Sequence, residues 1–249
     1  MGVSLPTESR ARAGADRAAV VTGAASGMGL AVAERFLAEG RIVVGVDRDA
    51  EALAKAAASH GPAYHPVIAD ITDRAALAAA LGPQLSSGAG AVVNAAGIYP
   101  ATTLADYHEA VYRRIFDVNV LGTLNVIAET VPALRACGGG AIVNFASIDA
   151  FAVSRGQLLY SASKAAIVSL TRSLAIELGD DNITVNAVAP GWVDTPGTRA
   201  GGRIEQAVKT IPLGRAAQPE EIADWVWKLC HGTYMTGETL VISGGLTVR

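Results

Sequence analysis

A tyrosine and a lysine stand four positions apart in this chain, at Tyr160 and Lys164, downstream of a glycine-rich segment at residues 22–29. Residues at i and i+4 share a helix face, so this spacing places a phenol beside an ammonium group. A nearby cation favours the phenolate and lowers the tyrosine pKa from about 10 toward neutrality. Such a phenol can exchange a proton with an alcohol oxygen. Helices carry single Y-x-x-x-K pairs by chance, so other motifs in the chain are needed to show whether this pair is catalytic.

The glycine-rich segment follows a short apolar run at residues 18–22 and holds Gly23, Gly27 and Gly29, with Ser26 and Met28 between them. Glycines between a buried strand and a helix let the backbone approach a pyrophosphate, which the free N–H groups of the helix N-terminus can bind. The spacing G-x-x-x-G-x-G differs from the better-known G-x-G-x-x-G. An ordinary glycine turn is the alternative. Its position after the first strand favours a dinucleotide site.

Two aspartates end predicted strands. Asp47 follows Gly29 by 18 residues, where a carboxylate can accept hydrogen bonds from ribose hydroxyls and repel a 2′-phosphate. The neighbouring Arg48 is able to bind that phosphate instead, and a solvated strand-end aspartate is the alternative for Asp47. We favour NAD over NADP. Asp70, next to Ile71, either reaches the adenine edge or caps the following helix.

Short β-branched runs alternate with longer helical segments, which predicts an α/β fold with a parallel sheet covered on both faces. The seven predicted strands are residues 18–22, 42–47, 67–70, 91–94, 141–147, 184–188 and 239–242. A helical stretch at 104–136 is expected in two pieces. The sequence predicts a flexible N-terminal tail at 1–17 and a single doubly wound Rossmann-type domain at 18–249, with a short substrate lid at about 196–210.

Composition excludes several classes of protein. The 249 residues carry a net charge of −3, so a nucleic-acid partner or an anionic membrane surface is not expected. No apolar run approaches the roughly 20 residues of a membrane span. The two cysteines form no C-x-x-C, and the four histidines show no ligand spacing with them, so we expect no metal site and a reducing, cytoplasmic location.

Together these motifs resemble those of the classical short-chain dehydrogenase/reductase family, in the family's order and over about residues 18–246. The family's T-G-x-x-x-G-x-G turn is residues 22–29, and its N-N-A-G turn appears as Asn94-Ala95-Ala96-Gly97, with alanine for the second asparagine. Its Y-x-A-S-K motif is residues 160–164, and its P-G motif is Pro190-Gly191, followed by Val193 and Thr195. Ser243 departs from the family's usual aspartate.

The resemblance implies a role for each member of a catalytic set. Tyr160 is the acid/base, and Lys164 lowers its pKa and binds the nicotinamide ribose. Ser147, 13 residues before Tyr160, holds the substrate oxygen, and Asn119 holds a water that connects Lys164 to solvent. The implied cofactor contacts are Gly23, Ser26, Gly27, Met28, Asp47, Arg48, Asp70, Ile71, Asn94, Ala95, Gly97, Tyr160, Lys164, Pro190, Gly191, Val193 and Thr195.

The substrate side is less defined. Tyr99 and Trp192 offer flat apolar walls, and Arg155 and Gln157 offer polar ends in the loop before Tyr160. The fork of Arg155 suits a substrate carboxylate, although a solvated loop arginine or a subunit salt bridge is the alternative. Arg199 and Arg203 in the lid carry the same ambiguity. Gly197, Gly201 and Gly202 predict a mobile lid.

The sequence therefore predicts an NAD(H)-dependent oxidoreductase that interconverts a secondary alcohol and a ketone on a small polar substrate. The enzymatic alternatives are an NADPH-dependent 3-oxoacyl-thioester reductase and a ring dihydrodiol or cyclitol dehydrogenase. A non-catalytic dinucleotide-binding sensor is the alternative from another class. The family resemblance also implies a homotetramer, built by the helix through Asn119 and the helix of Tyr160, and closed symmetry is usual for such assemblies.

Overall fold

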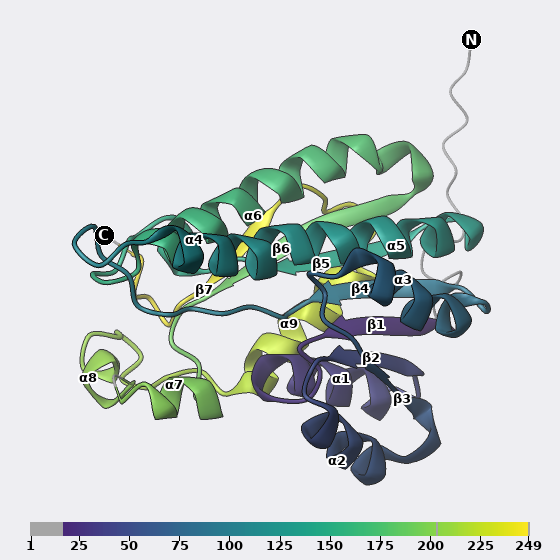
Figure 1. Ribbon diagram of the computed structural model, residues 1–249, viewed down its shortest axis with the longest axis horizontal. Helices are drawn as coiled ribbons and strands as arrows, with labels where there is room; N and C mark the ends of the chain where they lie inside the picture. The colour runs from purple at the N-terminus through teal and green to yellow at the C-terminus, as the bar shows by residue number, and fades with distance from the viewer. Residues whose placement is uncertain (1–16, 203, 249) are drawn as a thin grey trace.

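The computed structural model describes residues 17–202 and 204–248, so the expected tail lies outside the described residues apart from Arg17 (Figure 1). Its centre is a sheet of seven parallel strands in the order β3-β2-β1-β4-β5-β6-β7. The strands are β1 Ala18–Thr22, β2 Val43–Asp47, β3 Tyr64–Ile68, β4 Ala89–Asn94, β5 Gly140–Phe145, β6 Ile183–Pro190 and β7 Thr239–Ile242. Strand order reverses between β1 and β4, which is where doubly wound folds open a ligand crevice.

Helices connect the strands and cover both faces of the sheet (Figure 1). They are α1 Gly27–Ala38, α2 Ala50–His60, α3 Arg74–Leu81, α4 Glu109–Phe116, α5 Thr123–Ala136, α6 Leu158–Glu177, α7 Pro196–Ala200, α8 Ile204–Val208 and α9 Pro219–His231. Shorter turns are η1 Gly61–Ala63, η2 Gly82–Leu85, η4 Ile148–Ala150, η5 Gly179–Asp181 and the π-helical η3 Asp117–Gly122. The chain is thus a single Rossmann-like domain, as its sequence predicts.

Alternation along the strands builds a separate core on each side of the sheet. Val21 and Val93 face the layer of α1, α2 and α9, where they pack in one cluster with Phe36. Val20 and Val92 face the opposite layer, where α3 and α5 lie. Because both faces are covered, these strands are apolar throughout, as buried parallel strands are.

Two elements differ most from the sequence prediction, while the ends of β2, β4, β5 and β6 differ from it by one or two residues. The third strand is Tyr64–Ile68 rather than 67–70, because β3 pairs only with β2 and an edge strand tolerates Pro66, which has no N–H to donate. Asp70 therefore lies beyond the strand. The stretch predicted as helical from 104 begins only at Glu109, and its two pieces are joined without a break through the π-helical turn.

The described residues show neither a membrane span nor a metal cluster. In that part of the chain no helix combines the length and apolar character that a membrane span requires. Nor do three or more His, Cys, Asp or Glu side chains gather there in a way that would hold a metal ion.

Candidate active site

Two adjoining cavities open at the carboxyl ends of the strands. The smaller, of about 180 Å³, is bounded by α6, by the residues after β5 and β6, and by α7. We call it the Tyr160 cavity. The larger, of about 400 Å³, lies over the glycine-rich turn and the end of β2, and we call it the glycine-turn cavity. Both are lined by Met28, Ala95, Gly97, Tyr99, Thr195 and Gly197, so a ligand in one can reach the other.

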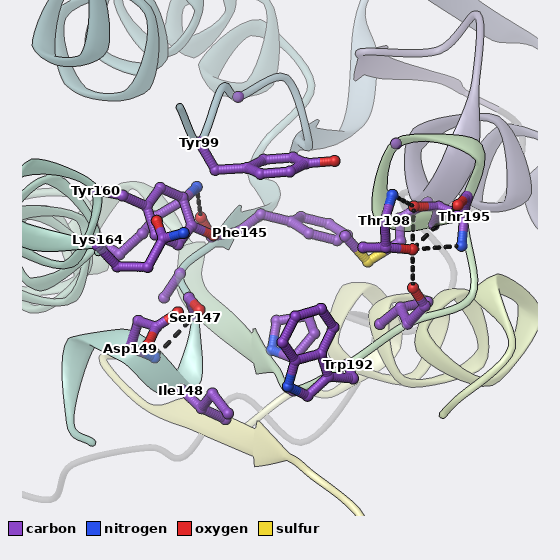
Figure 2. Close-up of a pocket in the computed structure, with 18 of the residues that line it drawn as sticks. Tyr99, Phe145, Ser147, Ile148, Asp149, Tyr160, Lys164, Trp192, Thr195 and Thr198 are labelled. Atoms are coloured by element: carbon purple, nitrogen blue, oxygen red, sulfur yellow. Dashed lines mark hydrogen bonds between the residues drawn. The ribbon is translucent and has the colours of Figure 1, made fainter. Parts of the chain in front are cut away.

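Tyr160 and Lys164 project from the first turns of α6 into the Tyr160 cavity. Figure 2 shows Tyr160 and Lys164 side by side, with Ser147 and Asp149 below them and Thr195 and Thr198 across the cavity. The Lys164 ammonium lies 5.7 Å from the centroid of the Tyr160 ring and donates a 2.6 Å hydrogen bond to the carbonyl of Phe145. The i, i+4 spacing thus has the geometry that the sequence predicts.

The pKa of Tyr160 corrects the sequence-based expectation. Burial raises the pKa of this phenol above its ordinary value, and the charge of Asp149 raises it further, while a hydrogen bond with Ser147 opposes both effects. Burial also lowers the pKa of Lys164 from 10.5 to about 8. The chain by itself therefore keeps Tyr160 protonated, because removal from water disfavours the phenolate more than its neighbours favour it.

Ser147 lies two residues beyond β5, at the N-cap of the short turn η4. Its Oγ accepts a 3.1 Å hydrogen bond from the backbone N–H of Asp149. This bond fixes the hydroxyl at the wall of the cavity that Tyr160 also lines. A hydroxyl held in this way is able to donate to a substrate oxygen next to the phenol.

Asn119 lies in the π-helical turn and is only 1% exposed. Its side-chain amide accepts from the N–H of Ile98 at 2.8 Å and donates to the carbonyl of Ile98 at 2.9 Å and to Ser163 Oγ at 3.0 Å. The side chain therefore fastens the loop after β4 to α6. A Cβ added to Gly97, which this loop carries, would lie 3.3 Å from Asn119 Oδ1 and 3.4 Å from Lys164 Nζ. The water-holding role of Asn119 stays a prediction.

The glycine-rich turn has the shape that a pyrophosphate requires. Gly23 has a φ of +67°, and a Cβ there would lie 3.0 Å from the backbone nitrogen of Ala96. A Cβ on Gly29 would collide with the carbonyl oxygen of Gly23. Ser26 is the N-cap of α1 without a side-chain capping bond, so the N-terminus of this helix faces a cradle that is free of side-chain bulk. The residues present thus fit a dinucleotide.

Asp47 connects this turn to β2. Its Oδ2 accepts from the backbone N–H of Ala25 at 3.1 Å, and its Oδ1 accepts from the N–H of Asp49 at 3.1 Å. The carboxylate lines the glycine-turn cavity together with the exposed Arg48. Both side chains therefore lie at the cavity that a bound nucleotide would fill. The carboxylate of Asp47 suits ribose hydroxyls, whereas the guanidinium of Arg48 suits a phosphate.

All but one of the predicted cofactor residues line one of the two cavities. The exception is Asn94, which is buried between strands and donates a 2.9 Å hydrogen bond to Asn144 Oδ1. Asp70 and Ile71 do line the glycine-turn cavity. Asp70 Oδ1 accepts from the N–H and the hydroxyl of Thr72, whereas the cap of the following helix is Asp73. Asp70 therefore stabilises the turn before α3 without capping the helix.

The segment after β6 brings the P-G motif to the wall of the Tyr160 cavity. Pro190, Gly191, Val193 and Thr195 all line it. Thr195 forms a capping box with Thr198 at the start of α7, and the Thr198 hydroxyl donates to the carbonyl of Val193 at 2.6 Å. This compact turn fixes where the predicted lid leaves the sheet. Of the lid arginines, Arg203 lies outside the described residues.

The substrate-side residues separate into two groups. Tyr99, Trp192 and Gln157 line the Tyr160 cavity, and the Tyr99 ring meets Tyr160 edge-on with centroids 6.1 Å apart (Figure 2). Arg155 is exposed and is not among the described residues that line this cavity. The loop turns its side chain to the surface, so the structure does not support its predicted contact with a substrate carboxylate.

The lid arginine Arg199 is likewise not positioned to bind a substrate carboxylate. It pairs with Asp194 through two hydrogen bonds, Nε to Oδ1 at 2.5 Å and Nη2 to Oδ2 at 2.7 Å. Because this bidentate pair occupies the fork of the guanidinium, Arg199 is not available to bind a substrate anion in this arrangement. The cation that the sequence suggested for an acidic substrate is therefore absent from the described walls of the cavity.

Comparisons with known proteins agree with this arrangement. A family model described as enoyl-(acyl carrier protein) reductase matches residues 23–247. Galactitol 2-dehydrogenase (L-tagatose-forming) of Cereibacter sphaeroides is 37% identical over 240 residues, covering 92% of this chain and 94% of that protein. The chain belongs to the classical short-chain dehydrogenase/reductase family.

Other short-chain dehydrogenases are similarly related to the chain. Cis-4-hydroxycyclohexanecarboxylate dehydrogenase of Sinomonas cyclohexanicum is 37% identical over 244 residues, covering 94% of this chain and 97% of that protein. The crystal structure of L-sorbose reductase from Gluconobacter frateurii, complexed with NADPH and L-sorbose, matches with a TM-score of 0.88 at 30% identity. That match covers 94% of this chain and 97% of the other. This short-chain dehydrogenase/reductase is thus an oxidoreductase of the class that acts on alcohols and ketones.

Sequence reasoning missed one residue that shapes the cofactor side. Tyr64, on β3, is 3% exposed, and its hydroxyl donates a 3.1 Å hydrogen bond to the carbonyl of Ala24 in the glycine-rich turn. Its ring lies over Gly45, where a Cβ would collide with it. Burial raises the pKa of Tyr64, and the charge of Asp47 adds to that effect, so the hydroxyl remains a donor. The available signal was the side-chain-free Gly45 in an otherwise valine-rich strand.

Proposed function

We propose that this short-chain dehydrogenase/reductase is an NAD(H)-dependent enzyme that interconverts a secondary alcohol and a ketone on a small polar substrate. The observation that carries the proposal is the junction of the two cavities. The phenol of Tyr160, the hydroxyl of Ser147 and the ammonium of Lys164 converge on one cavity, which adjoins a second one built over a glycine cradle. A substrate whose oxygen lies beside Tyr160 would have its reacting carbon close to the end of a dinucleotide that extends from the glycine cradle.

Each of these residues has a separate role in the reaction. Ser147 holds the substrate oxygen beside the phenol, and the apolar walls of Phe145 and Trp192 exclude water from it. In reduction, Tyr160 gives its proton to the oxygen as the carbonyl carbon receives a hydride, which a bound nicotinamide dinucleotide supplies. The nearby charge of Lys164 stabilises the phenolate that remains until it regains a proton from solvent. Oxidation runs the same steps backwards, with the phenolate accepting the hydroxyl proton.

The preference for NAD rests on Asp47. Its carboxylate is anchored to the N–H of Ala25 and so lies against the glycine-rich turn, where an adenosine ribose would bind. A 2′-phosphate at that point would meet a fixed negative charge. Arg48 is exposed at the same wall and is the residue that would favour NADP if Asp47 did not dominate.

The nature of the substrate is supported by the cavity and by relatives. The cavity is small, and the galactitol dehydrogenase and sorbose reductase are named for compact polyhydroxylated substrates. The alternative function, reduction of an acyl thioester, is favoured by the description of the matching family model. An acyl thioester needs an apolar channel for its chain, so activity on short water-soluble alcohols separates the two.

The test is a screen of secondary alcohols, ketones and 3-oxoacyl thioesters with both cofactors, followed by kinetics of Tyr160→Phe. Removing the phenolic oxygen hardly changes the volume, so folding and dinucleotide binding should persist. Turnover should fall by roughly 10²–10⁴, the usual contribution of a positioned acid/base. Near-normal turnover by Tyr160→Phe, or no activity of the wild type on any of these compounds, would reject the proposed function.

A further inference from the structure

The Tyr160 cavity carries a carboxylate where the sequence had suggested a cation. Asp149, which follows Ser147 by two residues, lines the cavity. Its Oδ1 accepts a 3.0 Å hydrogen bond from the N–H of Ser154, which fixes the carboxylate in place and leaves the second oxygen with no such bond to the loop. The charge of Asp149 is close enough to Tyr160 to help raise the pKa of that phenol.

Among the described residues that line the cavity, the one cation, Lys164, makes no ion pair with this carboxylate. The other charged side chain that lines it, Lys164, donates its hydrogen bond to Phe145 at the base of the site. Arg155 lies outside the lining, and Arg199 is paired with Asp194. A substrate carboxylate would therefore meet a fixed like charge, whereas a hydroxyl group could donate to it.

A second polar group in the same wall lacks a partner. Gln157 lines the cavity and is only 4% exposed, yet within the described part of the chain no donor reaches its buried Oε1. A buried polar atom without a hydrogen bond is costly, and a small rotation of this side chain toward the cavity would let a ligand hydroxyl donate to it. Gln157 is the N-cap of α6, three residues before Tyr160, and both residues line this cavity.

We propose that the substrate is an uncharged polyol, or the matching hydroxyketone, with one hydroxyl donating to Asp149 and another bonding to Gln157, and that Asp149 excludes substrates bearing a carboxylate. This inference rests on the proposed function, since it assumes alcohol–ketone chemistry at Tyr160. Asp149 and Gln157 act as specificity-determining residues. They select the hydroxyls that flank the reacting carbon and take no part in the proton transfer itself.

The experiment compares matched pairs that differ only in a carboxylate against a hydroxymethyl group. The pairs are cis-4-hydroxycyclohexanecarboxylate with cis-4-(hydroxymethyl)cyclohexanol, and 3-hydroxybutyrate with butane-1,3-diol. Steady-state kinetics with each cofactor gives the ratio of kcat/KM within a pair. For the wild type we expect the uncharged member to be favoured by at least tenfold, because the like charges disfavour the other.

Asp149→Asn tests the charge without changing the shape. The amide oxygen keeps the bond to the N–H of Ser154, while the repulsion and the charged acceptor are lost. The ratio within each pair should fall at least tenfold, mainly through KM, because such binding is equal in ground and transition states. Asp180→Asn, which removes an exposed charge far from the cavity, is the matched control and should leave the ratio unchanged. Gln157→Met should raise KM for the uncharged members about three- to tenfold without altering charge discrimination.

The possible outcomes distinguish failure of this inference from failure of the proposed function. Turnover in which the wild type prefers the carboxylate members would overturn this inference alone. So would an Asp149→Asn enzyme with the same ratio as Asp180→Asn. Absence of turnover with these pairs and with every other alcohol tested would overturn the proposed function, and this inference with it.

Discussion

Replacing the buried lysine by methionine should make the protein more stable at neutral pH while abolishing its activity. Lys164 is 5% exposed, and burial lowers its pKa from 10.5 to about 8. The folded state thus binds the lysine proton less tightly than the unfolded state. A difference of about 2.5 between the two pKa values corresponds to about 3 kcal/mol of stability lost while the group is charged. Methionine keeps the unbranched shape and carries no charge.

The expected net gain is smaller than this figure. Lys164→Met also removes the hydrogen bond to the carbonyl of Phe145, and an unpaired buried acceptor costs about 1–3 kcal/mol. At pH 7 we expect the variant to gain about 1 kcal/mol, which raises Tm by roughly 2–4 °C for a chain of this length.

The pH dependence gives the sharper test. The wild type recovers its lost stability as pH rises from about 8 toward 10.5, since the folded lysine then loses its proton before the unfolded one does. Between pH 7 and pH 9.5 the advantage of Lys164→Met should shrink by about 2 kcal/mol, measured by urea unfolding at both values. Lys55→Met, at an exposed position of α2, is the control. A Lys164→Met advantage with no more pH dependence than the control would refute the reasoning.

Three further outcomes are expected. NAD should exceed NADP by at least tenfold in kcat/KM, about 1.4 kcal/mol, and Asp47→Ser should erase that ratio; equal use of both cofactors by the wild type would show that Arg48 dominates. Tyr64→Phe frees the carbonyl of Ala24, so the Kd for the dinucleotide, measured by fluorescence titration, should rise several-fold while kcat at saturation persists; a loss of kcat with unchanged Kd would contradict this. Light scattering should give about four times the 25.4 kDa chain mass, and a monomer at micromolar concentration would reject the tetramer.

Local patterns were sufficient for the main architecture because they reflect short-range physics. The order of strand, glycine turn and helix at residues 18–38 follows from burial and from backbone freedom, and both are visible in residue types. The spacing of Tyr160 and Lys164 on one helix is likewise a local property. The sequence predicts the edge strand three residues too late. Pro66 is unfavourable in a central strand, and only the sheet topology shows that β3 has a neighbour on one side only.

What the sequence could not reveal depends on orientation and burial. Arg155 and Asp149 belong to the same loop, and nothing in their spacing says that the cation points outward while the carboxylate lines the cavity. The direction of the Tyr160 pKa is a further case, because proximity to Lys164 is local whereas removal from water depends on the whole fold. Asn94 lies in a turn motif, but its partner Asn144 comes from the next strand of the sheet.

The two cavities draw most of their walls from different halves of the chain. The glycine-turn cavity is built largely by residues 23–29, 46–52 and 69–71, and the Tyr160 cavity largely by 145–164 and 190–201. Substitutions in the later segments can therefore change which alcohol is accepted without disturbing the nucleotide cradle. This division makes the chain modular. Evolution or engineering can replace the segments around the Tyr160 cavity to change the range of substrates while the dinucleotide site stays the same.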